Sequence, residues 1–416
     1  MPSSGSDQAD ISAGGFWQQP MRERDRTFAA LRREPALTRH RPIRTAGADG
    51  AADFWAAVTH DDIVTVSRHP DLFCSSKGVG FSDIPPEYNE ALGSFLMTDA
   101  PRHTQLRRLV SRAFTPRQVT AIDEQIAAQA RSLVRATVEA GPCDLVDALA
   151  IPMPLWTISE MLGVPDERRA EFQQAANTMV QAQDPDFLTS GEDPFGQVLG
   201  AGITLSMLGV ELAAERREHP QDDLLTALVQ AEVDGERLQD EEIGAFCVLL
   251  GVAGNDTTRN SISHGVLAFH EHPDQWELLR AHPELLPTAV DEILRWASPV
   301  QTFRRTVTRP TELHGRPLAE GDHVVMFYGS GNRDEAVFVD PWRFDVTRTP
   351  NDHVAFGGGG PHYCLGANLA RTQLRAVFGE LLGPVAGFDV RDHKLLTGAF
   401  VNGVRRLEVT LDLATA

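Results

Sequence analysis

The stretch 356–371, FGGGGPHYCLGANLAR, constrains the fold more than any other part of the chain. Its four consecutive glycines and Pro361 exclude a regular helix or strand at that point. The residues after Cys364 favour a helix, so the stretch predicts a loop that ends where a helix begins. At a helix N-terminus, free N–H groups and the positive end of the helix dipole favour a cysteine thiolate.

Several uses of such a cysteine remain open from these residues alone. No second Cys or His lies at ligand spacing, so a zinc site is excluded. A lone cysteine is often a small buried hydrophobe, and a glycine-rich loop before a helix often binds an anion. A thiolate beside a glycine-rich backbone also suits the axial position of a haem iron.

A second stretch, LLGVAGNDTTRN at 249–260, lies inside a predicted helix over 240–269. Its two glycines weaken the helix by about 1 kcal/mol each relative to alanine. Ala253 and Thr257 share one helix face, which leaves room there for a small ligand. Asp256 lies about 100° round the helix from Thr257, where it could relay protons from solvent. The alternative is that Asp256 or Thr257 is the N-cap of a new helix.

The two stretches together resemble the cytochrome P450 family of haem-thiolate monooxygenases. The loop matches the family at five positions, Gly360, His362, Cys364, Gly366 and Ala367. Phe356 lies eight residues before Cys364, whereas the family phenylalanine lies seven before it, so the loop is one residue longer. The resemblance implies that Cys364 ligates haem b, with Phe356, Gly360 and Gly366 around the cofactor. It also implies that Asp256, Thr257 and Ala253 serve oxygen activation.

The resemblance assigns further residues to support of the haem. Its two carboxylates need cations or donors. The residues implied for this task are His103, Arg107, Arg305 and His362, with Arg304 as the rival of Arg305. Glu292 and Arg295 are i and i+3 on a predicted helix and can pair, although a solvated pair is the ordinary expectation. The resemblance implies instead a buried structural cluster of Glu292, Arg295 and Arg343.

The sequence predicts a mainly α fold with small peripheral β-sheets, a disordered segment at 1–15 and one haem domain at 16–416. The helices are expected at 21–34, 61–67, 103–113, 122–134, 156–162, 240–269 and 284–296. Asp61 is the expected N-cap of the second of these. Strands are expected at 54–59, 302–327 and 386–413, and long loops at 74–97 and 187–195.

Composition excludes some functions and compartments. The formal net charge of −20 argues against binding to nucleic acid or to an anionic membrane. The four cysteines show no pairing pattern, which fits a reducing cytosol. No secretion signal, membrane anchor or transmembrane span is expected, so the prediction is a cytoplasmic monomer.

The resemblance implies that the protein inserts one oxygen atom from O2 into an apolar substrate. Within the family, the sequence most resembles the branch that acts on sterol side chains and methyl-branched lipids. Terminal hydroxylation is expected; the alternatives are a terpenoid or polyketide tailoring hydroxylase or epoxidase, and a haem sensor without turnover. Pocket candidates are Leu96, Met97, Leu249, Val252, Ala253, Val300, Phe303, Phe400 and Val401. Ferredoxin and ferredoxin reductase are expected to bring electrons from NAD(P)H. The expected docking patch is Arg108, Arg112, Arg117, Arg371 and Arg375.

Overall fold

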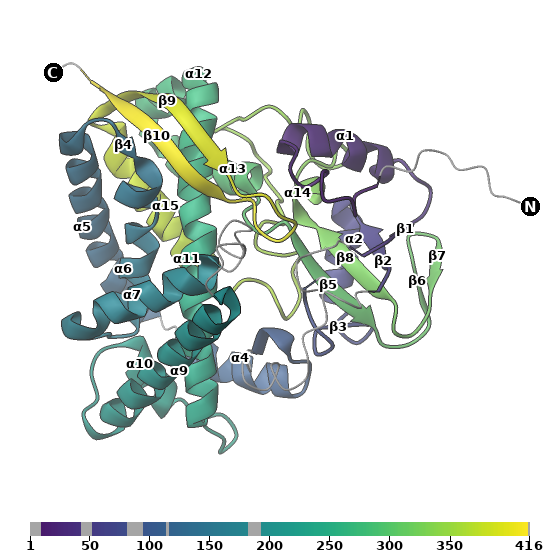
Figure 1. The fold of residues 1–416 in the computed structure, drawn as a ribbon, viewed down its shortest axis with the longest axis horizontal. Coiled ribbons are helices and arrows are strands. Elements are labelled where there is room, and N and C mark those ends of the chain that lie inside the picture. The colour runs from purple at the N-terminus through teal and green to yellow at the C-terminus, as the bar shows by residue number, and fades with distance from the viewer. Residues whose placement is uncertain (1–9, 43–51, 81–94, 114–115, 182–192, 415–416) are drawn as a thin grey trace, which may run out of the picture.

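The computed structural model describes residues 10–42, 52–80, 95–113, 116–181 and 193–414. The molecule has a helix-rich half and a smaller half built on a β-sheet (Figure 1). Helix α11 (Asp240–Glu271) runs the length of the helix-rich half, at its border with the sheet half (Figure 1). It is the longest described helix, and the site is built along its side.

The remaining helices surround α11 or cover the sheet. In the helix-rich half they are α4 (Arg102–Ala113), α5 (Pro116–Ala140), α6 (Pro152–Met161), α7 (Asp166–Gln181), α9 (Pro194–Glu218), α10 (Leu224–Gln230), α12 (Pro273–Ala281), α13 (Leu286–Ala297) and α15 (Ala367–Leu382). Beside the sheet lie α1 (Met21–Arg32), α2 (His60–Arg68) and the short α14 (Tyr328–Gly331). Single turns occur at η1 (Phe95–Met97), η2 (Val146–Ala150) and η3 (Pro283–Leu285).

The larger sheet has the strand order β1-β2-β8-β5-β3. Its strands are β1 (Thr38–His40), β2 (Phe54–Ala57), β3 (Phe73–Cys74), β5 (Thr302–Val307) and β8 (His323–Phe327). Among the described strands, only β2 and β8 pair in parallel, and β5 pairs antiparallel with β8 so that Arg305 lies opposite Val324. A second sheet joins β4 (Cys143–Asp144), β10 (Val404–Leu413) and β9 (Val385–Leu395), and β6 (Thr311–Leu313) pairs with β7 (Arg316–Leu318).

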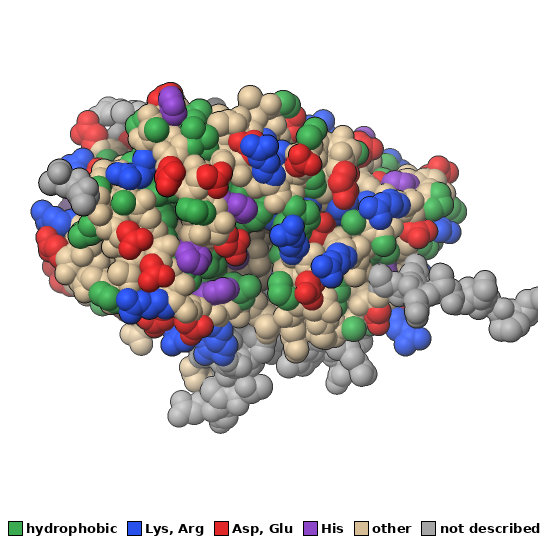
Figure 2. All heavy atoms as spheres, turned by 90° about the horizontal axis from the view of Figure 1, so that it is seen from above, with side chains coloured by type: hydrophobic (Ala, Val, Ile, Leu, Met, Phe, Trp, Pro, Cys, Tyr) green, Lys and Arg blue, Asp and Glu red, His purple; other side chains and the backbone are tan. Residues whose placement is uncertain are grey.

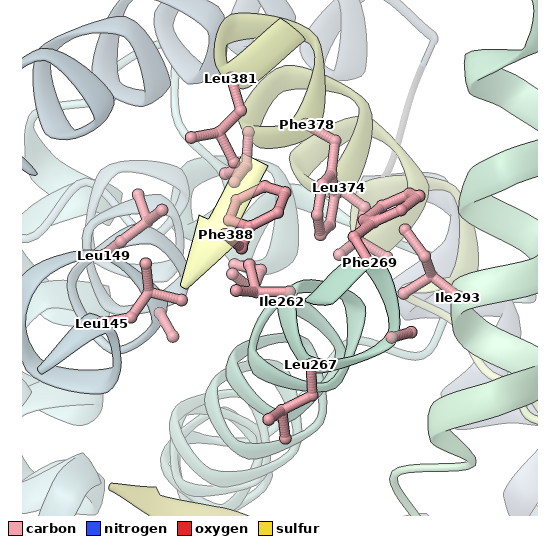
Figure 3. Packing of buried hydrophobic residues seen from close by; sticks show 14 of the residues in the cluster. Leu145, Leu149, Ile262, Leu267, Phe269, Ile293, Leu374, Phe378, Leu381 and Phe388 are labelled. Atoms are coloured by element: carbon pink, nitrogen blue, oxygen red, sulfur yellow. The ribbon is translucent and has the colours of Figure 1, made fainter. Parts of the chain in front are cut away.

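The main hydrophobic core packs the C-terminal half of α11 against α13, α15 and β9 (Figure 3). Phe269 of α11 has its ring centroid 5.7 Å from that of Phe378 on α15 and 6.3 Å from that of Phe388 on β9. Gly265 permits this approach, because a Cβ there would lie 2.4 Å from the ring of Phe378. The core therefore holds α11 and α15 together just beyond the cysteine loop.

Several sequence predictions are confirmed and some are corrected. Helix α11 is continuous through Asp256, so the N-cap alternative is wrong. Thr59, and not Asp61, caps α2, because its Oγ1 accepts the N–H of Asp62 at 3.1 Å. The predicted disordered segment extends too far, since Ile11 is fully buried and accepts a hydrogen bond from Trp17 Nε1. Residues 1–9 and most of the predicted loops lie outside the described residues.

Helix α9 was not predicted, and it is apolar over much of its length. The stretch Gly196–Glu218 has the length and mean hydropathy of a membrane span, with 39% of its most apolar window buried in the fold. Gly209 packs against Cys247 of α11 and Gly202 against Met179 of α7, so α9 is a packed helix of this fold. Length and composition alone are weak grounds for a span.

Candidate functional site

The cysteine loop is closed by its own backbone. The N–H of Cys364 donates to the carbonyl of Phe356 at 3.0 Å, and the N–H of Gly357 donates to Val354 at 2.9 Å. Three of the four glycines have left-handed φ angles of +96°, +91° and +73° at Gly357, Gly359 and Gly360. This conformation favours glycine strongly over other residues, which explains the composition of the loop.

The glycine row lies against helix α2. A Cβ on Gly358 would be 2.7 Å from the carbonyl oxygen of Ile63, and a Cβ on Gly360 would be 2.1 Å from that of Ser67. The glycines therefore let the loop lie directly against the backbone of α2. Gly366, at the start of α15, is different, because no atom lies within 4 Å of its Cβ position.

Cys364 is enclosed by protein and still accessible to solvent. It is an exposed free cysteine. Yet burial raises the pKa of its thiol, while the Gly366 N–H and the cations of Arg107 and Arg371 lower it. The sulfur of Cys364 is therefore reachable from solvent although protein atoms surround it.

Helix α11 is open at one place in its middle. Ala253 is exposed and Thr257 is half-buried, although Asn255, Asp256 and Thr258 beside them are buried. Thr257 Oγ1 donates to the carbonyl of Ala253 at 3.0 Å. These two residues share a face, as their spacing predicts, and that face is not covered by the described side chains.

Asp256 points into the protein and not to solvent. Its side chain is buried, and its Oδ1 accepts hydrogen bonds at 3.0 Å from Arg259 Nε and from Asn260 Nδ2. Burial raises the pKa of Asp256, and the charge and hydrogen bonds of Arg259 and Asn260 lower it. A direct path from solvent to this carboxyl is therefore absent in the described conformation, and a relay needs the side chain to turn.

Two histidines and two arginines form a cationic cluster beside the cysteine. The rings of His103 and His362 are 4.1 Å apart, and His362 Nε2 lies 3.2 Å from Ser75 Oγ. Arg107 donates to the carbonyl of Tyr363 at 2.8 Å. His103 Nε2 is buried and has no hydrogen-bond partner among the described residues. Burial, then electrostatic interactions with Arg305 and His103, lower the pKa of His362 to about 3.

Arg305 is buried without an ion pair in the described part of the chain. Its NH1 donates only to the carbonyl of Arg304 at 2.8 Å, and burial lowers its pKa. Arg304, its rival, donates to the carbonyl of Lys77 at 2.6 Å and so turns away along the strand. A buried cation that no described carboxylate neutralises and an imidazole nitrogen that no described group contacts fit the two carboxylates of haem.

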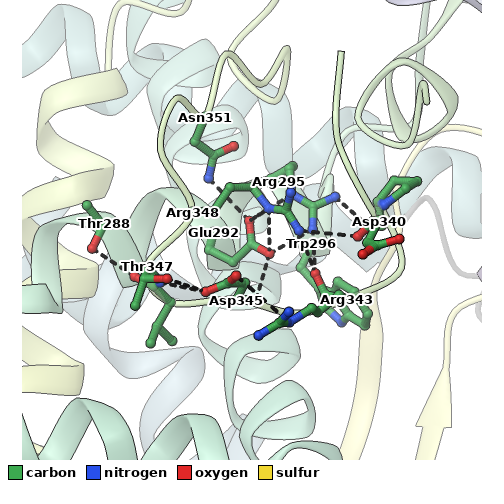
Figure 4. A network of polar contacts seen from close by, with 12 residues as sticks. Thr288, Glu292, Arg295, Trp296, Asp340, Arg343, Asp345, Thr347, Arg348 and Asn351 are labelled. Carbon is green, nitrogen blue, oxygen red and sulfur yellow. Dashed lines mark hydrogen bonds and ion pairs between the residues drawn. The ribbon is translucent and has the colours of Figure 1, made fainter. Parts of the chain in front are cut away.

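The Glu292–Arg295 pair is present and buried (Figure 4). Arg295 donates from Nε and NH2 to the two carboxylate oxygens at 2.7 Å each, and both side chains are 0% exposed. The third member was assigned wrongly. The Arg343 side chain is 65% exposed, because a turn to Asp340 directs it outward. Arg348 takes its place, with Nε 3.1 Å from Glu292.

The pocket candidates meet the cationic cluster through aromatic contacts. Phe303 on β5 lies 5.5 Å from Phe400 in an edge-to-face arrangement, and the Arg305 guanidinium lies 6.0 Å from the Phe303 ring. Val300 and Val401 form a β-bridge. Val401 is buried, and the other candidates are half-buried or exposed: Leu96, Met97, Leu249, Val252, Ala253, Val300, Phe303 and Phe400.

Sequence reasoning missed four polar residues of the site. Asp99 accepts the N–H groups of Ser75 and Ser76 at 2.9 and 3.0 Å. It so fixes the position of Ser75, whose hydroxyl lies beside His362. The other three are Arg259, Asn260 and Arg348. Arg259 and Asn260 stand three and four residues after Asp256, a helical spacing that could have indicated the contact.

Comparison with known proteins gives consistent matches. The family model described as Cytochrome P450 matches residues 210–384. A methyl-branched lipid omega-hydroxylase of Mycobacterium tuberculosis is 42% identical over 409 residues, covering 97% of this chain and 95% of the relative. A steroid C26-monooxygenase of Rhodococcus jostii is 39% identical over 368 residues, covering 87% of this chain and 76% of the relative.

Solved structures agree with this. A cytochrome P450 of Mycobacterium marinum in complex with pseudoionone superposes with a TM-score of 0.92 at 44% identity, covering 99% of this chain and 100% of that one. The resemblance identified from the cysteine loop and the central helix is therefore confirmed. The chain belongs to the cytochrome P450 family, whose members are monooxygenases that carry haem on a cysteine thiolate.

Proposed function

We propose that Cys364 supplies the thiolate for the haem iron. Solvent access to a sulfur that protein atoms surround, in the loop just before the N-cap Gly366 of α15, is the observation that carries this assignment. Bound haem supplies the activation of O2, and a thiolate ligand favours cleavage of the O–O bond. The Gly366 N–H and the Arg107 and Arg371 cations favour the thiolate over the thiol.

His103, Arg107, Arg305 and His362 would hold the two haem carboxylates. Arg305 is the strongest candidate, because its buried charge has no carboxylate at ion-pair distance in the described part of the chain. The neutral imidazoles offer N–H donors without adding charge, and His103 Nε2 is unused by any described group. Phe356 would support the loop through its ring, which contacts the Arg371 guanidinium at 4.6 Å.

Asp256 and Thr257 are proposed to move protons. Thr257 Oγ1 donates to Ala253 O in the described conformation, and rotation about its χ1 angle would release the hydroxyl from this carbonyl on the uncovered face of α11. Asp256 can replace a proton given up by Thr257 once its carboxyl leaves Arg259. In the described conformation the charge and hydrogen bond of Arg259 lower the pKa of Asp256 and burial raises it, so the turn of the side chain changes both influences.

The proposed substrate is a methyl-branched lipid or a sterol side chain, hydroxylated at its end. The names of the two relatives support this class, and so do the apolar side chains Phe303, Phe400 and Val300 near the cationic cluster. A second candidate is a shorter unsaturated ketone or terpenoid, favoured by the pseudoionone complex of the Mycobacterium marinum protein.

The test is a spectral titration followed by product analysis with phytanic acid, cholesterol and pseudoionone. A low- to high-spin shift with the first two, and products hydroxylated at the chain end, would support the proposal. Under the same conditions, the Cys364→Ala variant should lose the red-shifted absorption band of the reduced carbon monoxide complex. If that band persists in the variant, another residue is the ligand.

We propose ferredoxin as the electron donor, with docking on the cysteine side. The described structure narrows the expected basic patch. Arg371 is bound to Asp291 at 2.7 Å, whereas Arg108 is 63% exposed with Asp234 3.8 Å away, and Arg375 donates only to Thr372. The side chains of Arg112 and Arg117 lie outside the described residues.

Acidic and basic side chains are mixed on other parts of the surface, so docking of a ferredoxin would depend on a local basic patch. Acidic and basic side chains alternate over the face seen from above in Figure 2, and no single sign dominates it. Because the chain carries −20 overall, attraction to an acidic ferredoxin must be local. Reduction rates of Arg108→Glu and Arg375→Glu against salt test this. We also propose a cytoplasmic location, because the four cysteines show no pairing pattern and so fit a reducing compartment.

A further inference from the structure

The segment that joins β9 to β10 has an unusually complete set of hydrogen bonds. It reaches from the second sheet toward the boundary between the two halves of the molecule (Figure 1). Five consecutive carbonyls, from Gly398 to Asn402, each accept a hydrogen bond from outside the segment. We call residues 398–402 the clamped turn. Loops rarely have every carbonyl satisfied by residues distant in sequence, so this turn has one fixed path.

Gln301 makes three of these five bonds. Its backbone N–H donates to Phe400 O at 2.7 Å, and its side-chain Nε2 donates to Gly398 O at 2.7 Å and to Val401 O at 2.8 Å. Thr302 Oγ1 donates to Ala399 O at 2.7 Å. The start of β5 therefore holds the turn from one side.

The orientation of the Gln301 amide is set by Arg24. NH1 of Arg24, on α1 and 277 residues away, donates to Gln301 Oε1. A guanidinium has only donors, so the amide must direct its oxygen to Arg24 and both its N–H groups to the turn. Arg24 is itself 4% exposed and lies 5.4 Å over the ring of Trp17, which leaves it little freedom.

Helix α11 holds the other end of the turn. His264 Nε2 lies 3.0 Å from Asn402 O, and Asn260 Oδ1 accepts the N–H of Val404 at 2.9 Å. Asn260 also donates to Asp256 Oδ1 and Asp256 O. The turn is thus fixed relative to the proposed proton donor, since Asp256, Asn260 and His264 follow each other at four-residue spacing on one helix face.

The clamped turn carries Phe400 and Val401, two of the residues proposed to line the substrate pocket. Phe400 packs edge-to-face on Phe303, and Phe303 in turn lies against Arg305. A wall fixed at this point limits how far an apolar chain can slide past the cofactor. Oxidation at a terminal methyl needs such a limit, because internal C–H bonds are weaker and react more readily when they are equally close.

We propose that Gln301, oriented by Arg24, is a positioning residue that sets which carbon of the substrate chain is oxidised. It acts through the turn and does not itself touch substrate. This inference rests on the proposed function, since it presumes hydroxylation at the end of an apolar chain. It adds residues that lie outside the pocket to those that determine its specificity.

The test uses Gln301→Glu in the full-length, haem-loaded protein. Glutamate is nearly isosteric and keeps an acceptor for Arg24, but it removes both N–H donors and places oxygen against the carbonyls of Gly398 and Val401. Hydrogen exchange in the peptide spanning 396–404 should become at least about tenfold faster, because two of five bonds on the turn are lost. With phytanic acid, the ratio of terminal to penultimate hydroxylation should fall about tenfold.

Two further variants provide a second test and a stability control. Arg24→Met removes the group that orients the amide, and it should change the exchange rate and the product ratio in the same direction, by about threefold each. Val134→Ala, a buried substitution on α5 remote from the turn, controls for loss of stability and should leave the product ratio unchanged. If Gln301→Glu fails to fold, Arg24→Met decides.

The outcomes separate this inference from the proposed function. Wild-type turnover with an unchanged product ratio in both variants would overturn the inference and leave the proposed function intact. If wild-type protein converts neither phytanic acid nor cholesterol, the proposed function fails. Hydrogen exchange then decides whether Gln301 controls the turn, and equal rates in wild type and Gln301→Glu would overturn that as well.

Discussion

Two glycines in the cysteine loop should differ strongly in how much stability the same substitution costs. Gly360 has a φ of +73°, and an alanine Cβ there would lie 2.1 Å from the carbonyl oxygen of Ser67 in α2. Gly366 has a φ of −84°, and nothing lies within 4 Å of its Cβ position. The two sites are six residues apart, so the pair separates the effect of local backbone geometry from any general sensitivity of the loop.

The magnitude follows from two costs at Gly360. A left-handed alanine costs about 1–2 kcal/mol. Moving the loop away from a helix carbonyl, which cannot yield as a flexible side chain does, costs about 1–3 kcal/mol more. Gly360→Ala should therefore destabilise the protein by roughly 2–5 kcal/mol. At Gly366, alanine is a poorer N-cap than glycine, which lowers stability, but it also restricts the unfolded chain, which raises stability. The two effects nearly cancel, so the free energy of unfolding should change by at most about 0.5 kcal/mol.

Differential scanning calorimetry of the haem-loaded variants measures this. The unfolding entropy of a chain of about 400 residues is roughly 0.9 kcal/mol per kelvin, so Gly360→Ala should melt about 2–6 °C below wild type. Gly366→Ala should melt within about 1 °C of wild type. Equal melting temperatures for the two variants would refute the steric argument. Unchanged melting with reduced haem content would return Gly360 to a role at the cofactor.

The remaining predictions test the site and the buried ionisable groups. Thr257→Ala should lower product formed per reduced cofactor consumed by about 10²-fold, with hydrogen peroxide formed instead, and unchanged coupling would remove Thr257 from proton transfer. Arg348→Ala should cost about 2–4 kcal/mol, since it takes a charged donor from buried Glu292, whereas Arg343→Ala should stay within about 0.5 kcal/mol; denaturant unfolding compares them. Burial lowers the pKa of His264 to about 4, so the folded state binds its proton less readily than the unfolded state. Stability should therefore fall as pH drops from about 6.5 toward 4, by at most about 1.4 kcal/mol per pH unit for this group, and His264→Gln should reduce that slope in denaturation measured across pH.

Local sequence patterns predicted the features that depend on neighbouring residues. The continuous helix α11, its open face at Ala253 and Thr257, and the loop before α15 all follow from spacing or from glycine chemistry. The Glu292–Arg295 pair was predictable for the same reason, because it lies within one helix turn.

Features that depend on the path of the chain were beyond the sequence. Arg343 and Arg348 are both arginines in one irregular segment, and only the turn at Asp340 decides which of them faces Glu292. The burial of Asp256 likewise depends on packing around α11, which periodicity does not report. The role of the Gln301 side chain carried no signal at all, since the hydrogen-bond partners of this amide lie 97 to 277 residues away.

The contact between Arg24 and Gln301 also has a consequence for the order of assembly. During synthesis Arg24 leaves the ribosome 277 residues before Gln301, and the turn that Gln301 holds comes 97 residues later still. Helix α1 can therefore fold early in synthesis, but the proposed pocket wall can form only after residues 398–402 have been synthesised. A nascent chain that stops short of residue 398 would possess its cysteine loop and central helix without a finished pocket wall, and such intermediates expose apolar surface that invites aggregation.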